Sequence, residues 1–219
     1  MTILTARKDP LRAIGGVRPP DSRIAREAVE LVRDVSSRVL FNHVMRSYLF
    51  GELLARAKSG NYDREIVLLS AVLHDLGLTD LVGGSRRFEI EGADAARAFV
   101  VAHGLCEEKA WLVWDNIALH TFDHNLYRQP EARAVQSGIL ADAVGLGIER
   151  LGKGAVAEIL AAFPRLGFKR ELFRLLRHEA ETKPQGHIFH PSTMIAHHCL
   201  GGIHIPDARP MIDGAPFDE

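Results

Sequence analysis

Apolar residues recur at a helical period along most of this chain, and no segment shows the strict alternation of apolar and polar residues that marks a half-buried strand. Val135, Ile139 and Leu146, for example, are spaced so that they share one helix face. Asp21 and Ser22 are suitable N-cap residues for a helix that begins directly after them. The sequence therefore predicts an all-α fold, a single-domain helical bundle.

Glycine and proline divide the 219 residues into three parts. Residues 1–20 are expected to form an irregular lead-in and residues 21–182 the helical domain. Residues 183–219 are expected to form a loop-rich segment that packs on the domain or joins an interface. After a first helix that passes residue 31, further helices are predicted at 39–58, 62–75, 92–102, 107–120, 131–151, 155–163 and 169–181.

The composition is that of an ordinary globular protein, with 47% hydrophobic and 25% charged residues. The net charge of -1 gives no field that would attract nucleic acid or an anionic membrane. No apolar run reaches the roughly 20 residues of a spanning helix, and the first residues lack the apolar core of a signal peptide. Two cysteines provide no disulfide framework. We expect a cytoplasmic protein with a small-molecule substrate and no nucleic-acid or membrane partner; a homo-oligomer is compatible with these features.

His74 and Asp75 are adjacent and follow a strongly apolar stretch, in the run AVLHDLGLTD. A charged carboxylate at the end of a buried helix is costly unless a positive charge compensates it. A divalent metal ion would do so, since imidazole nitrogen and carboxylate oxygen are both good ligands. The pair therefore predicts part of a metal site, whose other ligands lie elsewhere in the chain.

Two further polar residues are predicted on apolar helix faces. Asp142 falls on the apolar face described above, where a solvated carboxylate is not expected. An Arg or backbone donors that compensate its charge are the alternative to a metal. His43 lies on an apolar face of the helix predicted at 39–58, and such a residue alone is more often a hydrogen-bonded core histidine. Together with the His-Asp pair, these residues form a mixed set that suits zinc, iron, manganese or another first-row metal.

The order of His43, then His74-Asp75, then Asp142 resembles the H…HD…D motif of the HD-domain metal-dependent hydrolase superfamily. In that superfamily the motif binds a catalytic metal inside an all-helical bundle. The resemblance implies that these four residues are ligands and that residues 21–182 form a domain of the HD type. One divalent transition metal ion is expected, with zinc as the first candidate and iron or manganese as the others.

Several separated segments are similar to the cyanamide hydratase-like branch of that superfamily. They are FNHVMRSYLFG, LHDLGLT, RRFEIEGADAARAF, WDNIALHT and SGILADAVGLGIE. The similarity implies hydration of a small nitrile-like substrate to an amide-type product. Many phosphohydrolases of the superfamily carry a Lys directly after the glycine of the motif, where this chain has Leu78. A phosphate-facing charge would then have to come from Arg46, Arg86 or Arg87.

Residues near the predicted ligands are candidates for catalytic or substrate-binding roles. His120 ends an apolar helix face and is predicted to act as an acid or base, with a further metal ligand or a core histidine bonded to a carbonyl as alternatives. Asp75 is predicted to be both a ligand and the acceptor of a proton from water. Arg46 would compensate the acidic site or meet the substrate. Phe88 and Thr121 are predicted to lie close to the substrate, although Thr121 could simply end its helix.

The C-terminal segment contains five of the 11 histidines. A cluster of this kind could hold a second metal, but it lacks cysteine partners and close ligand spacing. A segment that folds over the pocket or joins a subunit interface is the simpler interpretation. The five residues are His187, His190, His197, His198 and His204.

The sequence thus favours a metal-dependent hydratase or hydrolase, in which activated water attacks a small polar, nitrile-like substrate such as cyanamide, giving urea. The first alternative is an HD-type phosphohydrolase that acts on a nucleotide or another phosphomonoester with the same ligands. The second alternative is a non-catalytic module that binds a metal or ligand.

Overall fold

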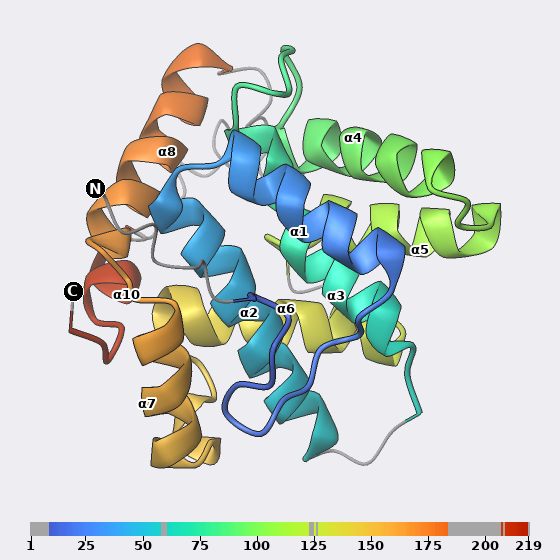
Figure 1. Ribbon diagram of the computed structural model, residues 1–219. Helices are drawn as coiled ribbons and strands as arrows, with labels where there is room; N and C mark the ends of the chain where they lie inside the picture. The colour runs from blue at the N-terminus through green and yellow to red at the C-terminus, as the bar shows by residue number, and fades with distance from the viewer. Residues whose placement is uncertain are drawn as a thin grey trace, which may run out of the picture.

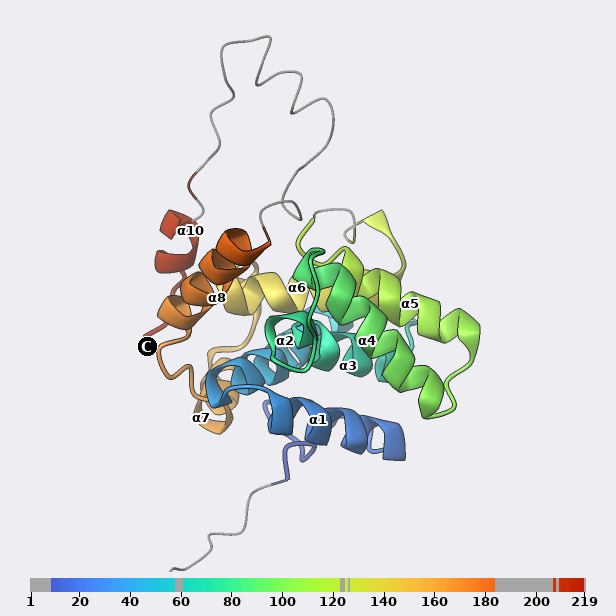
Figure 2. The ribbon, with the colours of Figure 1, turned by 90° about the horizontal axis from the view of Figure 1, so that it is seen from above.

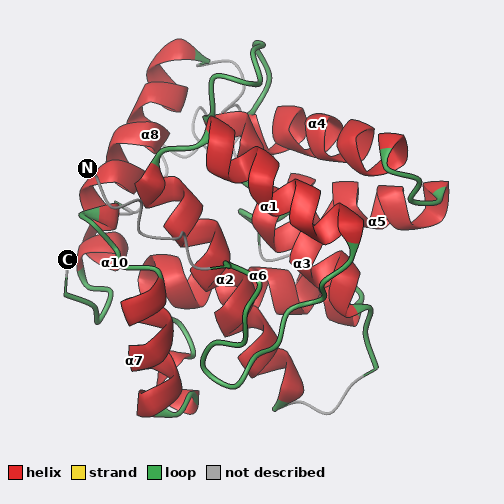
Figure 3. Cartoon of the chain, viewed as in Figure 1, coloured by secondary structure: helices red, strands yellow, loops and turns green. Residues whose placement is uncertain are grey.

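Helices form the regular structure of the chain throughout the part that can be described (Figures 1 and 3). The computed structural model describes residues 9–57, 61–122, 125, 127–183, 207 and 209–218. Within these ranges there is no strand, and a single isolated bridge joins Ile14 to Val17. The all-α prediction is confirmed. Among the same residues, no helix is both long enough and apolar enough to cross a membrane.

The first helix, α1 (Arg23–Val35), covers one side of the core with a narrow apolar stripe. Ser22 caps it by accepting a hydrogen bond from the backbone N–H of Ala25, as the sequence predicts. The buried residues of α1 lie at helical spacing, which orients this face toward α3 (Arg64–Leu73). They are Ala25, Ala28, Val29 and Val32.

The centre of the bundle consists of α2 (Arg38–Arg56), α3 and α6 (Pro130–Val144). Every residue of α3 from Ile66 to Leu73 is buried, and α2 is buried along most of its length. A helix that is apolar on all sides belongs in a protein interior. These three helices therefore form a fixed frame on which polar side chains can be held in the core.

The close contact between α2 and α6 depends on two glycines, Gly51 and Gly138. A Cβ atom added to Gly138 would lie 2.0 Å from the carbonyl oxygen of Ser47 and 2.6 Å from the backbone nitrogen of Gly51. A Cβ on Gly51 would lie 2.5 Å from the carbonyl oxygen of Ala134. The two backbones therefore approach one another more closely than any side chain would allow, which brings the inward faces of both helices together.

The remaining helices surround this centre on two sides (Figures 1 and 2). On one side, α4 (Phe88–Ala102) and α5 (Glu107–Ala118) pack as a pair, and α5 also contacts α3. On the other side lie α7 (Lys153–Ala162) and α8 (Phe168–Thr182), both in contact with α2. The short helix α10 (Arg209–Asp213) packs against α6 and α8.

Two helix boundaries differ from the sequence prediction by four residues or more. The helix predicted at 131–151 ends at Val144, because Gly145 adopts a left-handed conformation with φ of 77°, and Leu146 beyond it is exposed. A short 3-10 helix, η3 (Ile148–Arg150), follows separately. The helix predicted from residue 92 begins earlier, at Phe88. The C-terminal segment contains α10, and its five histidines lie outside the described residues.

The glycine contact between α2 and α6 gives a first prediction. Gly138→Ala should lower the free energy of unfolding by about 2–3 kcal/mol, because the new methyl group would overlap backbone atoms of α2. Gly154→Ala is the matched control, since a Cβ on Gly154 in α7 meets no atom within 4 Å. Its stability should stay equal or rise slightly. Urea denaturation measures both values, and an equal effect of the two substitutions would contradict the packing argument.

Candidate metal centre

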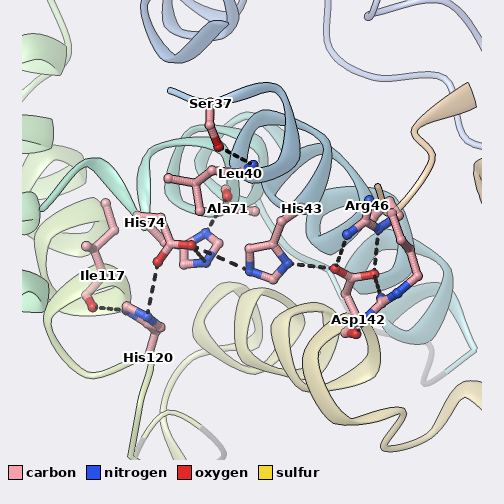
Figure 4. Close-up of polar contacts among 11 residues, drawn as sticks. Ser37, Leu40, His43, Arg46, Ala71, His74, Ile117, His120 and Asp142 are labelled. Carbon is pink, nitrogen blue, oxygen red and sulfur yellow. Dashed lines mark hydrogen bonds and ion pairs between the residues drawn. The ribbon is translucent and has the colours of Figure 1, made fainter. Parts of the chain in front are cut away.

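Four polar side chains converge inside the bundle, near the meeting point of α2, α3, α5 and α6 (Figure 4). His43 lies within α2, His74 directly follows α3, Asp75 follows His74, and His120 lies just beyond the end of α5. All four are buried, with exposed fractions between 1% for His74 and 5% for Asp75. Polar groups are buried to this extent only when they are paired or bind a metal.

The turn that carries His74 and Asp75 is fixed by a close backbone contact. After α3 the chain enters the short 3-10 helix η1 (Leu76–Leu78), which packs against α4. A Cβ on Gly77 would lie 2.0 Å from the carbonyl oxygen of Phe88, so only glycine allows α4 to begin at this place. The same contact brings the start of α4 beside the site, where the Phe88 ring meets the His120 ring edge to face at 5.6 Å.

Each of the three imidazoles is oriented by a hydrogen bond from its Nδ1 atom. His74 Nδ1 lies 2.8 Å from the carbonyl oxygen of Ala71, and His120 Nδ1 lies 2.7 Å from that of Ile117. A carbonyl can only accept, so both Nδ1 atoms carry the proton. His43 Nδ1 lies 2.6 Å from Asp142 Oδ2, a carboxylate oxygen that also accepts. All three rings can therefore present an unprotonated Nε2, the form in which histidine binds a metal.

These Nε2 atoms face the carboxylate of Asp75. Asp75 Oδ2 lies 3.3 Å from Nε2 of His74 and 3.6 Å from Nε2 of His43, and Asp75 Oδ1 lies 3.9 Å from Nε2 of His120. Ligand atoms about 2.1 Å from a tetrahedral zinc ion are themselves about 3.4 Å apart. Ligand atoms of His43, His74 and Asp75 all lie within 4.8 Å of one another. This buried group could hold a metal ion.

Asp142 is placed differently from its predicted role as a fourth ligand. Its Oδ1 and Oδ2 atoms accept hydrogen bonds from Arg46 Nε at 2.7 Å and Arg46 Nη2 at 2.8 Å. Arg165 Nη1 adds a contact of 3.1 Å to Oδ1, and His43 occupies Oδ2. In this structure the Asp142 carboxylate is compensated by arginine, the alternative considered for it, and it orients His43 through Nδ1. Asp142 is not in the group of described residues whose ligand atoms lie close enough together to hold a metal.

The two buried aspartates differ in how their charges are compensated. Burial would raise the pKa of Asp142, but the charge of Arg46 and hydrogen bonds from His43 and Arg46 hold that pKa well below its usual value. Burial also opposes ionisation of Asp75, yet His74, His43 and His120 keep the pKa of Asp75 below its usual value. The ion-pair partners found for Asp75 in the described chain are histidines alone. A bound cation would supply the fixed positive charge that Asp142 already has.

The histidines respond to the same environment. Burial lowers the pKa of His120 to about 4, with His74 adding to the shift and Asp75 opposing it. Burial likewise lowers the pKa of His43, against the opposing hydrogen bond of Asp142. His74 is an exception, because although burial acts to lower its pKa, the adjacent charge of Asp75 raises it. At neutral pH, His43 and His120 are therefore uncharged and able to accept a proton or bind a cation.

Two residues near the site have no counterpart in the sequence prediction. Phe168, at the start of α8, stacks on the His43 ring with centroids 4.3 Å apart. The guanidinium groups of Arg46 and Arg165 lie over the same phenyl ring, at 5.4 and 4.9 Å. Aromatic and cation–π contacts join these groups only after folding. No local pattern marks Arg165 or Phe168, which lie more than a hundred residues from His43 in the sequence.

The arginines considered for substrate phosphate are engaged elsewhere. Arg46 is wholly buried against Asp142, and Arg86 pairs with Asp94 on the surface. Arg87 forms an ion pair of 2.6 Å with Glu89 and lies over the Phe122 ring.

Thr121 Oγ1 donates a hydrogen bond of 2.5 Å to Glu89 Oε1, so its hydroxyl is held by the start of α4. Thr121 and Phe88 both line the cavity beside His120, where the sequence predicts them near substrate. Arg46 does not line this cavity, because it lies on the far side of His43, against Asp142.

Comparison with known proteins gives no family for this chain, since neither protein-family models nor curated protein sequences match it. The resemblance to the HD-domain superfamily therefore stays a prediction. The case for a metal centre rests on the geometry of the residues themselves.

The ligand group predicts how substitutions change metal binding. His74→Ala removes an Nε2 atom from the group. Loss of a hydrogen-bond partner of a ligand lowers metal affinity roughly tenfold to hundredfold, and we expect loss of the ligand itself to lower the affinity for zinc by more. His103→Ala is the control, because His103 also bonds a helix carbonyl but lies outside the group. Titration of purified protein with zinc, followed by elemental analysis, measures both. Equal metal content in the two variants would exclude His74 as a ligand.

The charge pair behind His43 gives a prediction for stability. Arg46→Met leaves Asp142 with one cation fewer in the core and should cost about 3–5 kcal/mol of unfolding free energy. Arg86→Met removes an exposed ion pair and should cost at most about 1 kcal/mol. Chemical denaturation at neutral pH distinguishes the two. A small loss for Arg46→Met would show that the buried pair is dispensable.

Proposed function

We propose that this chain is a metal-dependent hydratase or hydrolase that adds water to a small substrate. The observation that carries the proposal is the convergence of three buried imidazole Nε2 atoms on the carboxylate of Asp75. His43, His74 and Asp75 are the proposed ligands of a divalent metal, with zinc as the first candidate and iron or manganese as alternatives. A metal ion in this position supplies Lewis acidity, which lowers the pKa of water toward neutrality.

The protein groups around that position have separate proposed roles. Asp75 accepts the proton that leaves water, since its carboxylate is ionised and faces the centre of the group. His120 passes this proton on, because its uncharged Nε2 lies 3.9 Å from Asp75 Oδ1 and its ring is fixed by the Ile117 carbonyl. Asp142 holds His43 in one tautomer and one orientation, and Arg46 keeps Asp142 ionised.

The resemblance to cyanamide hydratase-like proteins supports a nitrile-like substrate. Addition of water to R–C≡N breaks both π bonds of the C–N group and both O–H bonds of water, and it forms a C=O group at the nitrile carbon and two N–H bonds. The proton taken by Asp75 reaches the nitrogen through His120, and the second proton of water follows it to give the amide R–C(=O)NH₂. No oxidant or reductant is needed. A phosphomonoester has less support, because Arg46, Arg86 and Arg87 are each paired with a carboxylate and none of the three is among the described residues that line the cavity.

The test couples metal content to turnover. Zinc-loaded protein is assayed with cyanamide, simple nitriles, and a nucleotide panel with phosphate detection. Asp75→Asn should abolish turnover, whereas the exposed Asp80→Asn should leave it unchanged. His120→Ala should lower kcat by about 10²–10⁴ while metal is retained.

Three outcomes would count against the proposal. Activity in metal-free protein would refute the metal assignment. Phosphate release without nitrile turnover would replace the reaction with a phosphohydrolase. Loss of metal from His120→Ala would make His120 a ligand instead of a proton carrier.

A further inference from the structure

A cavity of about 220 Å³ opens directly beside the candidate metal centre. His43, His74, Asp75 and His120 lie at one end of it, together with Thr121. The cavity is large compared with cyanamide, since about 150 Å³ is enough for a benzene-sized molecule. A substrate that reacts at the polar end therefore has room for a body of several carbon atoms.

The walls of this cavity are hydrocarbon. On the α6 side they consist of Ile139, Leu140, Ala143 and Val144. On the opposite side, Leu172 and Leu176 come from α8, one turn apart and in line with Phe168. The α10 helix closes the wall with Met211 and Ile212. Three helices that meet only through tertiary folding thus direct aliphatic side chains into one space.

The cavity offers little to a charged substrate. None of the described residues that line it is a Lys or Arg. Among the described lining residues Asp75 is the one carboxylate, and its oxygens face the histidines. The hydroxyl of Thr121 already donates to Glu89. Beyond the metal centre, an anionic group of a substrate would lose its hydration without meeting a Lys or Arg among the described lining residues, which is unfavourable.

We propose that the natural substrate is an uncharged organic molecule whose reactive polar group meets the metal centre and whose hydrocarbon body fills this cavity. For the reaction proposed above, it is an aliphatic or aromatic nitrile, hydrated to the corresponding amide, in preference to cyanamide. The reaction rests on the proposed function, whereas the selectivity for a hydrocarbon body rests on the cavity walls alone.

The first experiment measures selectivity without turnover. The probes are straight-chain primary amides from acetamide to hexanamide, which resemble the expected products, and binding is followed by calorimetry with and without zinc. Each added methylene should tighten binding about fourfold until the cavity is full. An affinity that stays flat or falls along the series overturns the proposal. Because the walls do not involve the metal, the trend should also appear in zinc-free protein.

Two variants localise the effect. Leu172→Arg places a cation in the wall and should remove most of the chain-length dependence, whereas Leu146→Arg, at an exposed position outside the lining, should preserve it. Ala143→Leu fills part of the space, and the affinity should stop rising at a shorter amide. Melting temperatures of all variants show whether each one is folded. An unchanged series in a folded Leu172→Arg protein would contradict the assignment of this wall.

The second experiment compares turnover of butyronitrile, benzonitrile and cyanamide by zinc-loaded protein. A higher kcat/KM for the two organic nitriles supports the proposal, and a preference for cyanamide overturns it. If the amides bind with the expected chain-length dependence but no nitrile reacts, the cavity selects hydrocarbon bodies as proposed and the hydration reaction is wrong. Failure of the two proposals can therefore be distinguished.

Discussion

The buried carboxylate of Asp142 is the interaction on which the site depends. Two guanidinium groups and one imidazole meet it, from Arg46, Arg165 and His43. Arg46 also donates to the carbonyl oxygen of Phe163 at 3.0 Å, which ties the connection between α7 and α8 to the centre of α2. A buried charge of this kind is tolerated only with all its partners in place. The packing of α2, α6 and the start of α8 is therefore coupled to the orientation of one histidine.

The three histidines of the candidate centre all form a hydrogen bond through Nδ1, but the acceptors are of two kinds. His74 and His120 each bond a carbonyl three residues earlier, at the end of their own helix. Their orientation is local, because any helix that ends at this position offers the same acceptor. His43 instead depends on Asp142, which lies 99 residues away. The orientations of His74 and His120 are thus set by secondary structure, and that of His43 by the tertiary fold.

This difference explains what the sequence could predict. Helical periodicity predicts the all-α bundle. Polar residues on apolar helix faces or directly after an apolar stretch indicate His43, Asp75 and Asp142 as candidate site residues. Periodicity gives the face of a side chain but not its partner, so it does not reveal that Arg46 and Arg165 compensate the charge of Asp142. The partner residues lie on separate segments, and their meeting is a property of the assembled core. Helix ends were predicted less well, because left-handed Gly145 ends α6 where the apolar pattern continues.

Two parts of the chain contribute differently to the cavity. Residues up to α6 carry the reactive groups, whereas α8 and α10 contribute hydrocarbon wall and no member of the ligand group. The first turn of α8 contacts the candidate metal centre directly, since Phe168 stacks on His43. Beyond it, Leu172 and Leu176 have hydrocarbon side chains, which form no hydrogen bond or ion pair with His43 or Asp142. For the proposed function, exchange of side chains along these later turns would therefore change the size and polarity of the substrate that binds and leave the ligand group in place, which makes the C-terminal helices the natural place to alter substrate selectivity.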